Sequence, residues 1–422
     1  MSAITRIQGM QDLLPEDWRY WSYVIQTATD TAQNFGFEQI SVPVMEKHDL
    51  FVRGIGTSAD FFVQKEMYTI EESNGSFITL RPEFTAGVVR AYLNNGFANR
   101  TQPVKVFMFG PIFRRERPQA GRFRQHSQFD CEIMGEMDPA TDVEVMMLAM
   151  TTYQKLGYQG LTFQMNSTGC RECRPTYIET LRTYLNDYVD QLAPVDIERL
   201  GKNPLRVLDS KEKGMQAILA NAPHLADHLC DDCDEHFGQV KSLLTALGQS
   251  YSINFRLVRG MDYYEKTVFE VWAQGIGAQA AVCGGGRYNL APEIGGHSVP
   301  CVGFGSGIER IILGMKDAGV EPPPQAYPKV MITHFGGTSK QAAHVLAFQL
   351  REAGVGAIVA FARTKRSVKS QMREANKRKV DYVLILGEDE VAAQTVKIRP
   401  MGDGDQTSMA QSDVIAWLQA RL

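Results

Sequence analysis

Apolar residues near the start of the chain recur at helical spacing. Six of them follow one another at steps of three or four positions: Trp18, Trp21, Ile25, Ala28, Ala32 and Phe35. This spacing places them on one face of an amphipathic helix. Pro15 can open that helix and Gly36 can end it. The pattern therefore predicts a helix with one buried stripe.

The pattern then changes to extended segments, several of which alternate apolar and polar residues. These segments cover residues 37–44, 68–70, 77–80, 104–109, 125–134, 251–259 and 267–272. Helical patterns around residues 83–95 and 142–156 interrupt them. Together they predict an α+β domain built on an antiparallel sheet. Residues 170–250 differ, because Pro194, Pro204 and Pro223 divide them into short helical pieces, and we interpret this stretch as an insertion.

A proline-rich spacer at residues 321–328 separates this part from a second pattern. Beyond it, predicted strands and helices alternate at residues 329–334, 339–353, 355–361, 367–379 and 382–386. This alternation predicts a small α/β domain. We expect a first domain over residues 1–325, with its helical insertion at about 170–240, and a second over residues 328–422.

Composition narrows the class of protein. The chain has 422 residues, 44% hydrophobic and 22% charged, which is ordinary for a soluble globular protein. It lacks the run of about 20 apolar residues that a membrane span needs, and its start does not resemble a signal peptide. We therefore expect an intracellular protein with no membrane partner. The net charge is −4, yet residues 328–422 carry 14 Lys and Arg against 9 Asp and Glu, so this segment is the better candidate for a polyanion-binding face.

The seven cysteines are an odd number in a chain too long to need disulfides, which fits a reducing cytoplasm. Cys170 and Cys173 form one C-x-x-C pair, and Cys230 and Cys233 form another. This spacing is also typical of zinc ligands. We favour the interpretation that the pairs pack as small apolar side chains on the insertion, and we assign no metal to the chain.

The densest concentration of charge lies between two predicted strands. Residues 113–124 contain five arginines, which could clamp phosphates or could form an ordinary solvated basic turn. In the strand that follows, Gln128, Asp130 and Glu132 alternate with apolar residues and so share one face. A polar face on a strand that is otherwise apolar favours a ligand pocket.

Two further segments are suggestive. In residues 257–270, Arg259 precedes Tyr263 and Tyr264, which could form a site or merely a cross-strand contact. Two glycine-rich stretches follow, at residues 284–288 and 302–310. Neither is a Walker phosphate loop or a dinucleotide-binding fingerprint, and a glycine turn that opens a helix is often only a packing feature.

Taken in order, these segments resemble a known family. Pro43, residues 113–132 and residues 303–310 are similar to motifs 1, 2 and 3 of the class II aminoacyl-tRNA synthetases, and residues 257–270 and 284–288 resemble signatures of the histidine-specific members. The whole chain thus resembles histidyl-tRNA synthetases. This resemblance implies a class II antiparallel-sheet catalytic domain and a C-terminal α/β anticodon-binding domain. It also implies a cytoplasmic homodimer that activates L-histidine with ATP and Mg²⁺ and charges tRNA(His).

The resemblance also implies roles for individual residues. Arg259 and Arg114 are the expected catalytic residues, because both would contact the α-phosphate. The expected histidine-binding residues are Glu83, Thr85, Arg114, Gln128, Glu132, Arg259, Tyr263, Tyr264 and Tyr288. The expected ATP-binding residues are Arg114, Glu116, Phe123 and Arg310. Arg117 and Gln119 would contact the acceptor end of the tRNA.

A basic run in the C-terminal segment contains Arg363, Lys365, Arg366, Lys369, Arg373, Lys377, Arg378 and Lys379. It could be a solvated helix face, but the resemblance favours contact with RNA. Three rival functions stay open: a regulatory paralogue that binds histidine without charging tRNA, a synthetase-like RNA sensor, and another class II synthetase. The paralogue generally lacks both the C-terminal domain and the equivalent of Arg259.

Overall fold

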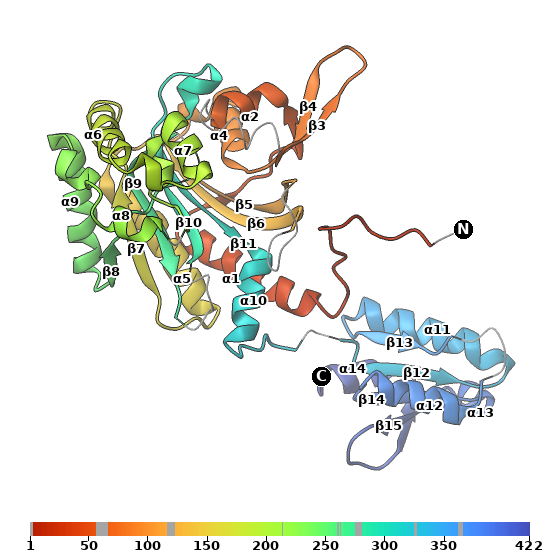
Figure 1. Ribbon diagram of the computed structural model, residues 1–422. Coiled ribbons are helices and arrows are strands. Elements are labelled where there is room, and N and C mark those ends of the chain that lie inside the picture. Colours follow the sequence, from red (N-terminus) through yellow and green to blue (C-terminus); the bar gives the residue numbers. More distant parts are fainter. Residues whose placement is uncertain are drawn as a thin grey trace. The chain divides into compact units, whose positions relative to one another are not determined.

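The computed structural model describes residues 3–55, 66–115, 123–212, 214–259, 261, 263–274, 281–324, 327–361 and 366–422. The chain divides into two compact units, Met1–Pro323 and Pro324–Leu422 (Figure 1). None of the helices in these ranges combines the length and the apolar character that a membrane span requires.

An eight-stranded sheet forms the centre of the first unit. Its strands, in spatial order, are β1 (Glu38–Gln39), β5 (Val104–Phe113), β6 (Gln125–Met134), β11 (Cys301–Gly307), β10 (Ala281–Tyr288), β9 (Tyr264–Trp272), β7 (Thr162–Ser167) and β8 (Tyr251–Ile253). The six central strands are antiparallel, whereas β1 and β8 pair in parallel with their neighbours. The expected antiparallel sheet is confirmed.

Alternation along β5 explains why both faces of this sheet are buried. Phe107 packs in one hydrophobic core, and its neighbours Val106 and Met108 pack in another, because successive side chains point to opposite faces. The first core is covered by α1 (Trp18–Asn34), α5 (Pro139–Lys155), α9 (Asp231–Ala246) and α10 (Ile308–Asp317). The second is covered by α2 (His48–Ile55) and α4 (Thr85–Asn94).

A small sheet lies beside α2 and α4. It consists of β2 (Met45–Lys47), β4 (Phe77–Leu80) and β3 (Tyr68–Glu71), in that order. Only two residues of the segment 37–44 form the strand β1. Beyond this strand, the carbonyl of Val42 accepts from Arg81 Nη1 at 2.6 Å.

The insertion has a core of its own. Its helices are α6 (Arg174–Asn186), α7 (Pro194–Lys202) and α8 (Met215–Ala220), which gather beside β7 and β9 (Figure 1). Tyr177, Leu181, Val207 and Leu219 are buried together there. Helix α9 behaves differently, since its residues Phe237, Val240 and Leu244 belong to the core of the large sheet.

The glycine-rich stretches are strands, which differs from the expectation of a glycine turn. Gly284, Gly285 and Gly286 lie within β10, and Gly303 and Gly305 lie within β11. Each strand is paired on both sides, so the sheet supplies the backbone hydrogen bonds that hold these glycines extended.

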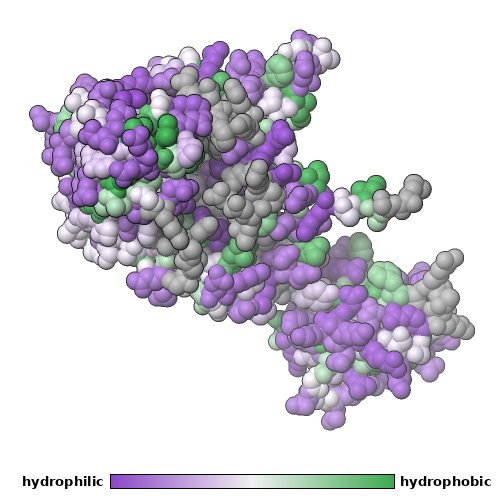
Figure 2. Space-filling view, in the orientation of Figure 1, coloured by the Kyte–Doolittle hydropathy of each residue, from purple (hydrophilic) through white to green (hydrophobic). Residues whose placement is uncertain are grey.

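The second unit is a five-stranded sheet with helices, as the alternating pattern predicts. Its order is β13 (Ala357–Val359), β12 (Val330–His334), β14 (Tyr382–Leu386), β15 (Thr395–Pro400) and β16 (Thr407–Ala410). The first three strands are parallel and the last two antiparallel. Its helices are α11 (Gly337–Glu352), α12 (Val368–Lys377), α13 (Glu388–Ala392) and α14 (Val414–Gln419). The face of this unit seen in Figure 2 is mainly hydrophilic.

Candidate active site

The site is built on strands whose polar side chains face glycines. Gln128, Asp130 and Glu132 of β6 are paired in register with Gly307, Gly305 and Gly303 of β11. A Cβ atom on Gly303 would lie 1.7 Å from Glu132 Oε2, and one on Gly305 would lie 3.1 Å from Asp130 Oδ1. The glycines of β11 therefore make room for carboxyl groups that are buried on the neighbouring strand.

The same device accommodates Arg259. A Cβ atom on Gly284 of β10 would lie 2.5 Å from Arg259 Nη1. The guanidinium donates from Nη1 to Glu270 Oε1 of β9 at 3.0 Å, and Glu270 Oε2 accepts from Trp272 Nε1 at 2.9 Å. The ion pair with Glu270 thus fixes the Arg259 side chain over β9 and β10, and Gly284 leaves room for its guanidinium.

A cavity of about 520 Å³ brings most of the predicted site residues together. The predicted residues that line it are Glu83, Thr85, Arg114, Phe123, Gln128, Arg259, Tyr263, Tyr264 and Arg310. They come from segments spread over more than half of the chain. Glu116, Arg117 and Gln119, which were predicted to bind ATP and tRNA, lie outside the described residues.

Glu132 and Tyr288 support the cavity wall through a hydrogen-bond network. Glu132 Oε1 accepts from Thr85 Oγ1 at 2.9 Å, and Oε2 accepts from Tyr288 Oη at 2.8 Å. Glu132 is 2% exposed, and its burial raises the pKa of the carboxyl to about 8. In the ionised form each carboxylate oxygen keeps an unused lone pair, so the group can accept from a ligand that donates a hydrogen bond or carries positive charge.

The acidic side of the cavity contains unsatisfied acceptors. Glu83 Oε1 accepts from the backbone N–H of Ala86 at 3.0 Å, where it caps the start of α4. Among the described residues, the buried atoms Glu83 Oε2, Gln128 Oε1 and Asp130 Oδ1 have no hydrogen-bond partner. Burial raises the pKa of Glu83, and burial together with the charge of Glu132 raises that of Asp130 well above its ordinary value. Such a surface favours a cationic or hydrogen-bond-donating ligand.

The basic side of the cavity carries Arg114, Arg259 and Arg310. Arg114 is fixed by its Nε, which donates to the carbonyl of Pro82 at 2.9 Å. Arg310 lies in the first turn of α10, next to Glu309, whose two carboxylate oxygens accept from the N–H of Ser127 at 2.9 and 3.0 Å. Guanidinium groups in such a cluster can bind a polyanionic ligand opposite the acidic wall.

Three tyrosines form an aromatic group at the cavity. The ring centroid of Tyr263 lies 4.9 Å from that of Tyr264 and 5.3 Å from that of Tyr288. Tyr264 also lies 5.9 Å from the guanidinium of Arg259. The predicted Tyr263–Tyr264 pair therefore contacts the site and is more than a cross-strand contact.

The cavity lining confirms the polar face that includes Asp130, and it also contains His126, Arg206, Glu270 and Glu309, to which the sequence pattern assigned no role. His126 continues the alternation of Gln128, Asp130 and Glu132 along β6, so the same pattern could have identified it. Its Nδ1 has no partner among the described residues, and burial together with Arg114 lowers the pKa of its imidazole to about 4. His126 is therefore neutral at pH 7.

Two motifs identified in the sequence do not line this cavity. Arg287, which follows the three glycines of β10, is fully buried and donates from Nε to Asp142 Oδ2 at 3.0 Å. The two cysteine pairs were expected to pack as small apolar side chains. In the structure all four sulfur atoms lie within 4.8 Å of one another.

The basic run of the second unit is divided by one acidic residue. Glu374 accepts from Arg366 Nη1 at 2.8 Å and from Arg378 Nε at 2.9 Å. Lys369, Arg373 and Lys377 are exposed, and the described part of the chain offers them no ion-pair partner. Because these three residues are spaced four apart on α12, they form one stripe of charge. Arg363 and Lys365 lie outside the described residues.

Comparisons with known proteins agree with this arrangement. The family described as histidyl-tRNA synthetase matches residues 9–311, and the family described as anticodon binding domain matches residues 329–421. The chain is 44% identical to a histidine–tRNA ligase of Dehalococcoides mccartyi, over 98% of this chain and 99% of that one. It is 43% identical to a histidine–tRNA ligase of Pelotomaculum thermopropionicum, over 99% and 98% of the two chains.

A solved structure supports the same conclusion. The structure of apo histidyl-tRNA synthetase from S. aureus superimposes with a TM-score of 0.82 at 29% identity, covering 98% of this chain and 99% of that one. Since the family match, the full-length relatives and this structure agree across both units, the chain belongs to the histidyl-tRNA synthetase family.

Proposed function

We propose that this protein joins L-histidine to ATP as histidyl-adenylate, releases pyrophosphate and transfers the histidyl group to the 3′ end of tRNA(His). One observation carries the proposal. The cavity combines Arg259, held by Glu270, with a carboxylate oxygen of Glu83 that has no hydrogen-bond partner among the described residues. An amino acid presents opposite charges on adjacent groups, and this pair of side chains is complementary to them.

The α-amino and carboxylate groups of histidine are assigned to different walls. Glu83 Oε2 and Gln128 Oε1 accept from the ammonium group, with Thr85 beside them, which would satisfy two buried acceptors. Arg259 binds the carboxylate and then the α-phosphate. Since the carboxylate is already ionised at neutral pH, activation needs orientation and charge stabilisation but no general base.

Selection of the imidazole is assigned to Glu132, Tyr263, Tyr264 and Tyr288. Glu132 has a spare lone pair on each oxygen, and Tyr264 has a hydroxyl that can donate. An amino acid without imidazole nitrogens would leave these buried groups unpaired, at a cost of about 1–3 kcal/mol for each. The network from Thr85 through Glu132 to Tyr288 keeps the carboxyl oriented.

ATP is assigned to the basic side of the cavity. Arg114 binds the α-phosphate, Arg310 the γ-phosphate, and Phe123 lies against the adenine, while Glu116 is a further proposed contact. Mg²⁺ is compatible with Glu309, because each of its carboxylate oxygens retains a lone pair, and a cation would offset the burial that raises the pKa of that carboxyl to about 7. Together with the phosphates, Glu309 would hold the ion, which would neutralise part of the triphosphate charge.

The reaction then follows from positions and charges. The histidine carboxylate oxygen attacks the α-phosphorus, the bond to the bridging oxygen of pyrophosphate breaks, and Arg114 and Arg259 stabilise the charge on the α-phosphate oxygens. In the second step a ribose hydroxyl of the tRNA attacks the carbonyl carbon, the new ester bond forms as the bond to AMP breaks, and the hydroxyl proton leaves with AMP. Arg117 and Gln119 are proposed contacts of the acceptor end.

The remaining assignments concern partners and organisation. We place catalysis in residues 1–325, with the insertion at about 170–240, and anticodon binding in residues 328–422, where the stripe Lys369, Arg373 and Lys377 can contact phosphates. A homodimer is supported by apolar residues on and beside the small sheet, since Met45 is 49% exposed and Phe77 is 48% exposed. Because the proposed reaction uses ATP to aminoacylate tRNA, we propose that the protein acts in the cytoplasm.

The test is ATP–pyrophosphate exchange on the purified protein with each of the twenty amino acids, without tRNA. We expect exchange with histidine alone. Arg259→Ala should lower that exchange by about 100-fold to 1000-fold, the scale for removal of a transition-state donor, while histidine binding survives. Arg171→Ala is the control, because Arg171 is exposed and pairs only with Glu293 among the described residues.

The other outcomes separate the rivals. Histidine binding without exchange would favour the regulatory paralogue or an RNA sensor. Exchange with a different amino acid would favour another class II synthetase. Unchanged exchange in Arg259→Ala would remove the proposed role of that arginine.

A further inference from the structure

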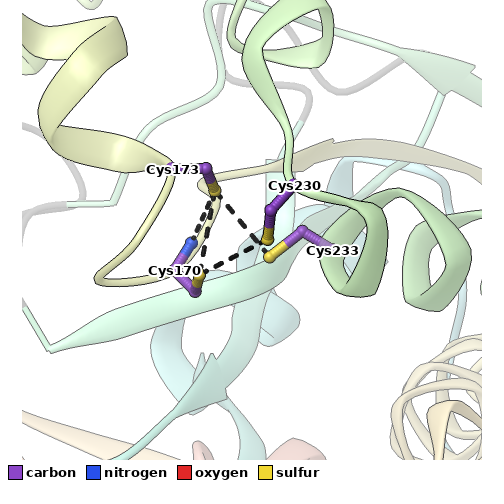
Figure 3. Close-up of side chains that lie close together, drawn as sticks. All are labelled: Cys170, Cys173, Cys230 and Cys233. Atoms are coloured by element: carbon purple, nitrogen blue, oxygen red, sulfur yellow. Dashed lines mark hydrogen bonds between the residues drawn. The ribbon is translucent and has the colours of Figure 1, made fainter.

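Four cysteines meet where the insertion joins the large sheet. Cys170 and Cys173 lie between the end of β7 and the start of α6, and Cys230 and Cys233 lie at the start of α9. All four side chains converge on one point (Figure 3). The Sγ atoms of Cys170 and Cys173 are 3.8 Å apart, those of Cys170 and Cys230 are 3.7 Å apart, and those of Cys173 and Cys233 are 3.9 Å apart.

These separations match those around a tetrahedral metal ion. With Zn–S bonds of about 2.3 Å, the edges of the sulfur tetrahedron are about 3.8 Å long. A disulfide would need sulfur atoms about 2.0 Å apart, whereas these cysteines are free. The separations therefore fit a shared ion better than two covalent bonds.

The backbone around the sulfurs is arranged to support thiolates. The N–H of Cys170 donates to Cys173 Sγ at 3.2 Å, and the N–H of Glu172 donates to Cys170 Sγ at 3.4 Å. Cys230 is the N-cap of α9, and Cys233 lies in its first turn, near the positive end of the helix dipole. Gly169 has φ +62°, and a Cβ atom there would lie 2.8 Å from Cys173 Sγ, so the turn needs a glycine to leave room for the sulfur.

We propose that Cys170, Cys173, Cys230 and Cys233 bind one Zn²⁺ ion in a closed tetrahedral site. Four protein sulfurs leave no position for water or substrate, so the ion is structural and takes no part in the chemistry of the cavity. Binding would release protons from the thiols, since the thiolate is the ligand.

The ion would close the base of the insertion. One cysteine pair precedes α6 and the other begins α9, so the separate core around Tyr177 and Leu219 lies between them in sequence. The site is also connected to the cavity. Arg174, next to Cys173, donates to the carbonyl of Tyr264, and the N–H of Lys266 donates to the carbonyl of Gly169 at 2.8 Å. Zinc would therefore hold the strand that carries Tyr264 against the insertion.

Metal analysis of the full chain tests this proposal. The protein is expressed with zinc supplied and purified in reducing buffer without chelators, and its metal content is measured by mass spectrometry. We expect about one zinc per chain. The double variant Cys173→Ser/Cys233→Ser should lose the zinc, whereas Cys131→Ala, a buried cysteine of β6 outside the cluster, should retain it.

A second measurement does not depend on the variants. The zinc is removed from the unmodified chain and replaced with Co²⁺, and we expect the thiolate-to-cobalt charge-transfer bands and intense visible bands of a tetrahedral sulfur site. This result would support the proposal even if the double variant fails to fold. Neither measurement depends on histidine activation, so the zinc proposal and the proposed function can fail separately.

Several results would overturn the assignment. If the unmodified chain contains zinc only at the background level and shows no cobalt–thiolate bands after Co²⁺ is added, the cluster does not bind the ion. Iron in place of zinc, zinc retained in the double variant, or disulfides among the four cysteines in metal-free protein would each contradict it.

Discussion

Arg259 Nη1 lies 3.0 Å from Glu270 Oε1, directly over the bare backbone of Gly284. The ion pair fixes the direction of the guanidinium, and the absence of a side chain on Gly284 lets the guanidinium pack directly against the backbone of β10. Arg259 is therefore oriented before any substrate binds, which reduces the reorganisation that the transition state requires.

Gly284→Ala should impair activation without removing a charged group. The new methyl group would meet three atoms of the guanidinium at 2.5–2.8 Å and would push Arg259 aside. A displacement of about 1 Å can cost about 100-fold in rate. We expect a loss of that order in pyrophosphate exchange with the fold retained, as checked by circular dichroism.

The matched control is Gly238→Ala in α9, where a Cβ atom would meet no atom of the described residues within 4 Å. That variant should exchange pyrophosphate like the unmodified protein. Equal activity of the two variants would mean that the position of Arg259 is not limiting.

Glu132→Gln should stabilise the free protein increasingly as the pH rises. The pKa of Glu132 is about 8 in the folded chain, whereas an unfolded glutamate titrates near 4.5. Between these values the folded state holds a proton that the unfolded state has released, so stability falls as the pH rises. Glutamine has no such dependence. Urea unfolding should give the variant an advantage at pH 8, relative to pH 5.5, on the order of 1–3 kcal/mol.

The same variant should discriminate less well in favour of histidine, because an amide, which cannot ionise when the ligand binds, replaces the carboxyl group that faces the imidazole. Glu71→Gln, an exposed carboxyl on β3, is the control and should show neither change. An advantage of Glu132→Gln that does not vary with pH would contradict the raised pKa, and an unaltered preference for histidine would contradict its role in selection.

Arg287→Leu should destabilise the first unit strongly. Arg287 and Asp142 are both fully buried and ion-paired. Removal of the guanidinium leaves the buried Asp142 carboxyl beside His236 Nε2, 3.5 Å away, without its arginine partner, and breaking such a pair costs about 3–5 kcal/mol. The double variant Arg287→Leu/Asp142→Leu should recover part of this loss. Denaturant unfolding measures both.

Arg182→Leu provides the comparison, since Arg182 pairs with Glu179 at 3.6 Å near the surface and should cost less than about 1 kcal/mol from the ion pair. A single Arg287→Leu variant as stable as the unmodified chain would mean that the buried pair does not stabilise the fold.

Neutralising the stripe on α12 should weaken tRNA binding and leave amino-acid activation intact. In Lys369→Gln/Arg373→Gln/Lys377→Gln, we expect the KM for tRNA(His) to rise about 10-fold at low salt and the salt dependence of binding to decrease by about 2 in the log–log slope. Aminoacylation and filter binding measure these effects.

Lys397→Gln is the control in the same unit, because Lys397 is paired with Glu390 and its charge is already compensated. Unchanged tRNA binding in the triple variant would mean that the stripe on α12 is only a solvated helix face and does not contact RNA.

The bounds of a strand could be predicted where its own residues alternate between apolar and polar. The alternation of Gln128, Phe129, Asp130 and Cys131 placed β6 at residues 125–134, and the structure has the same bounds. The α/β alternation of the second unit was equally local, and β14 was also placed at its observed bounds, residues 382–386.

The other features of the site depend on contacts between segments that are far apart in the sequence, and the pattern of one strand does not reveal these contacts. Glycine has low strand propensity, so Gly303 and Gly305 indicated a turn. The charged side chains beside them, which give the reason for their small size, are brought there only by the folded chain. The clustering of Cys170 with Cys230 likewise depends on the path of the insertion between them. Arg287 could not be recognised as structural, because only the folded chain brings Asp142 to it.

Helix α9 takes part both in the cysteine cluster at the base of the insertion and in the core of the large sheet. Its first turn carries Cys230 and Cys233, while Phe237 and Val240 pack under the large sheet. Helices α6 to α8 are buried mainly among themselves. The insertion can therefore open as a subglobal unit without melting the sheet, and the amides of α9 should remain protected with the sheet while those of α6 to α8 exchange together.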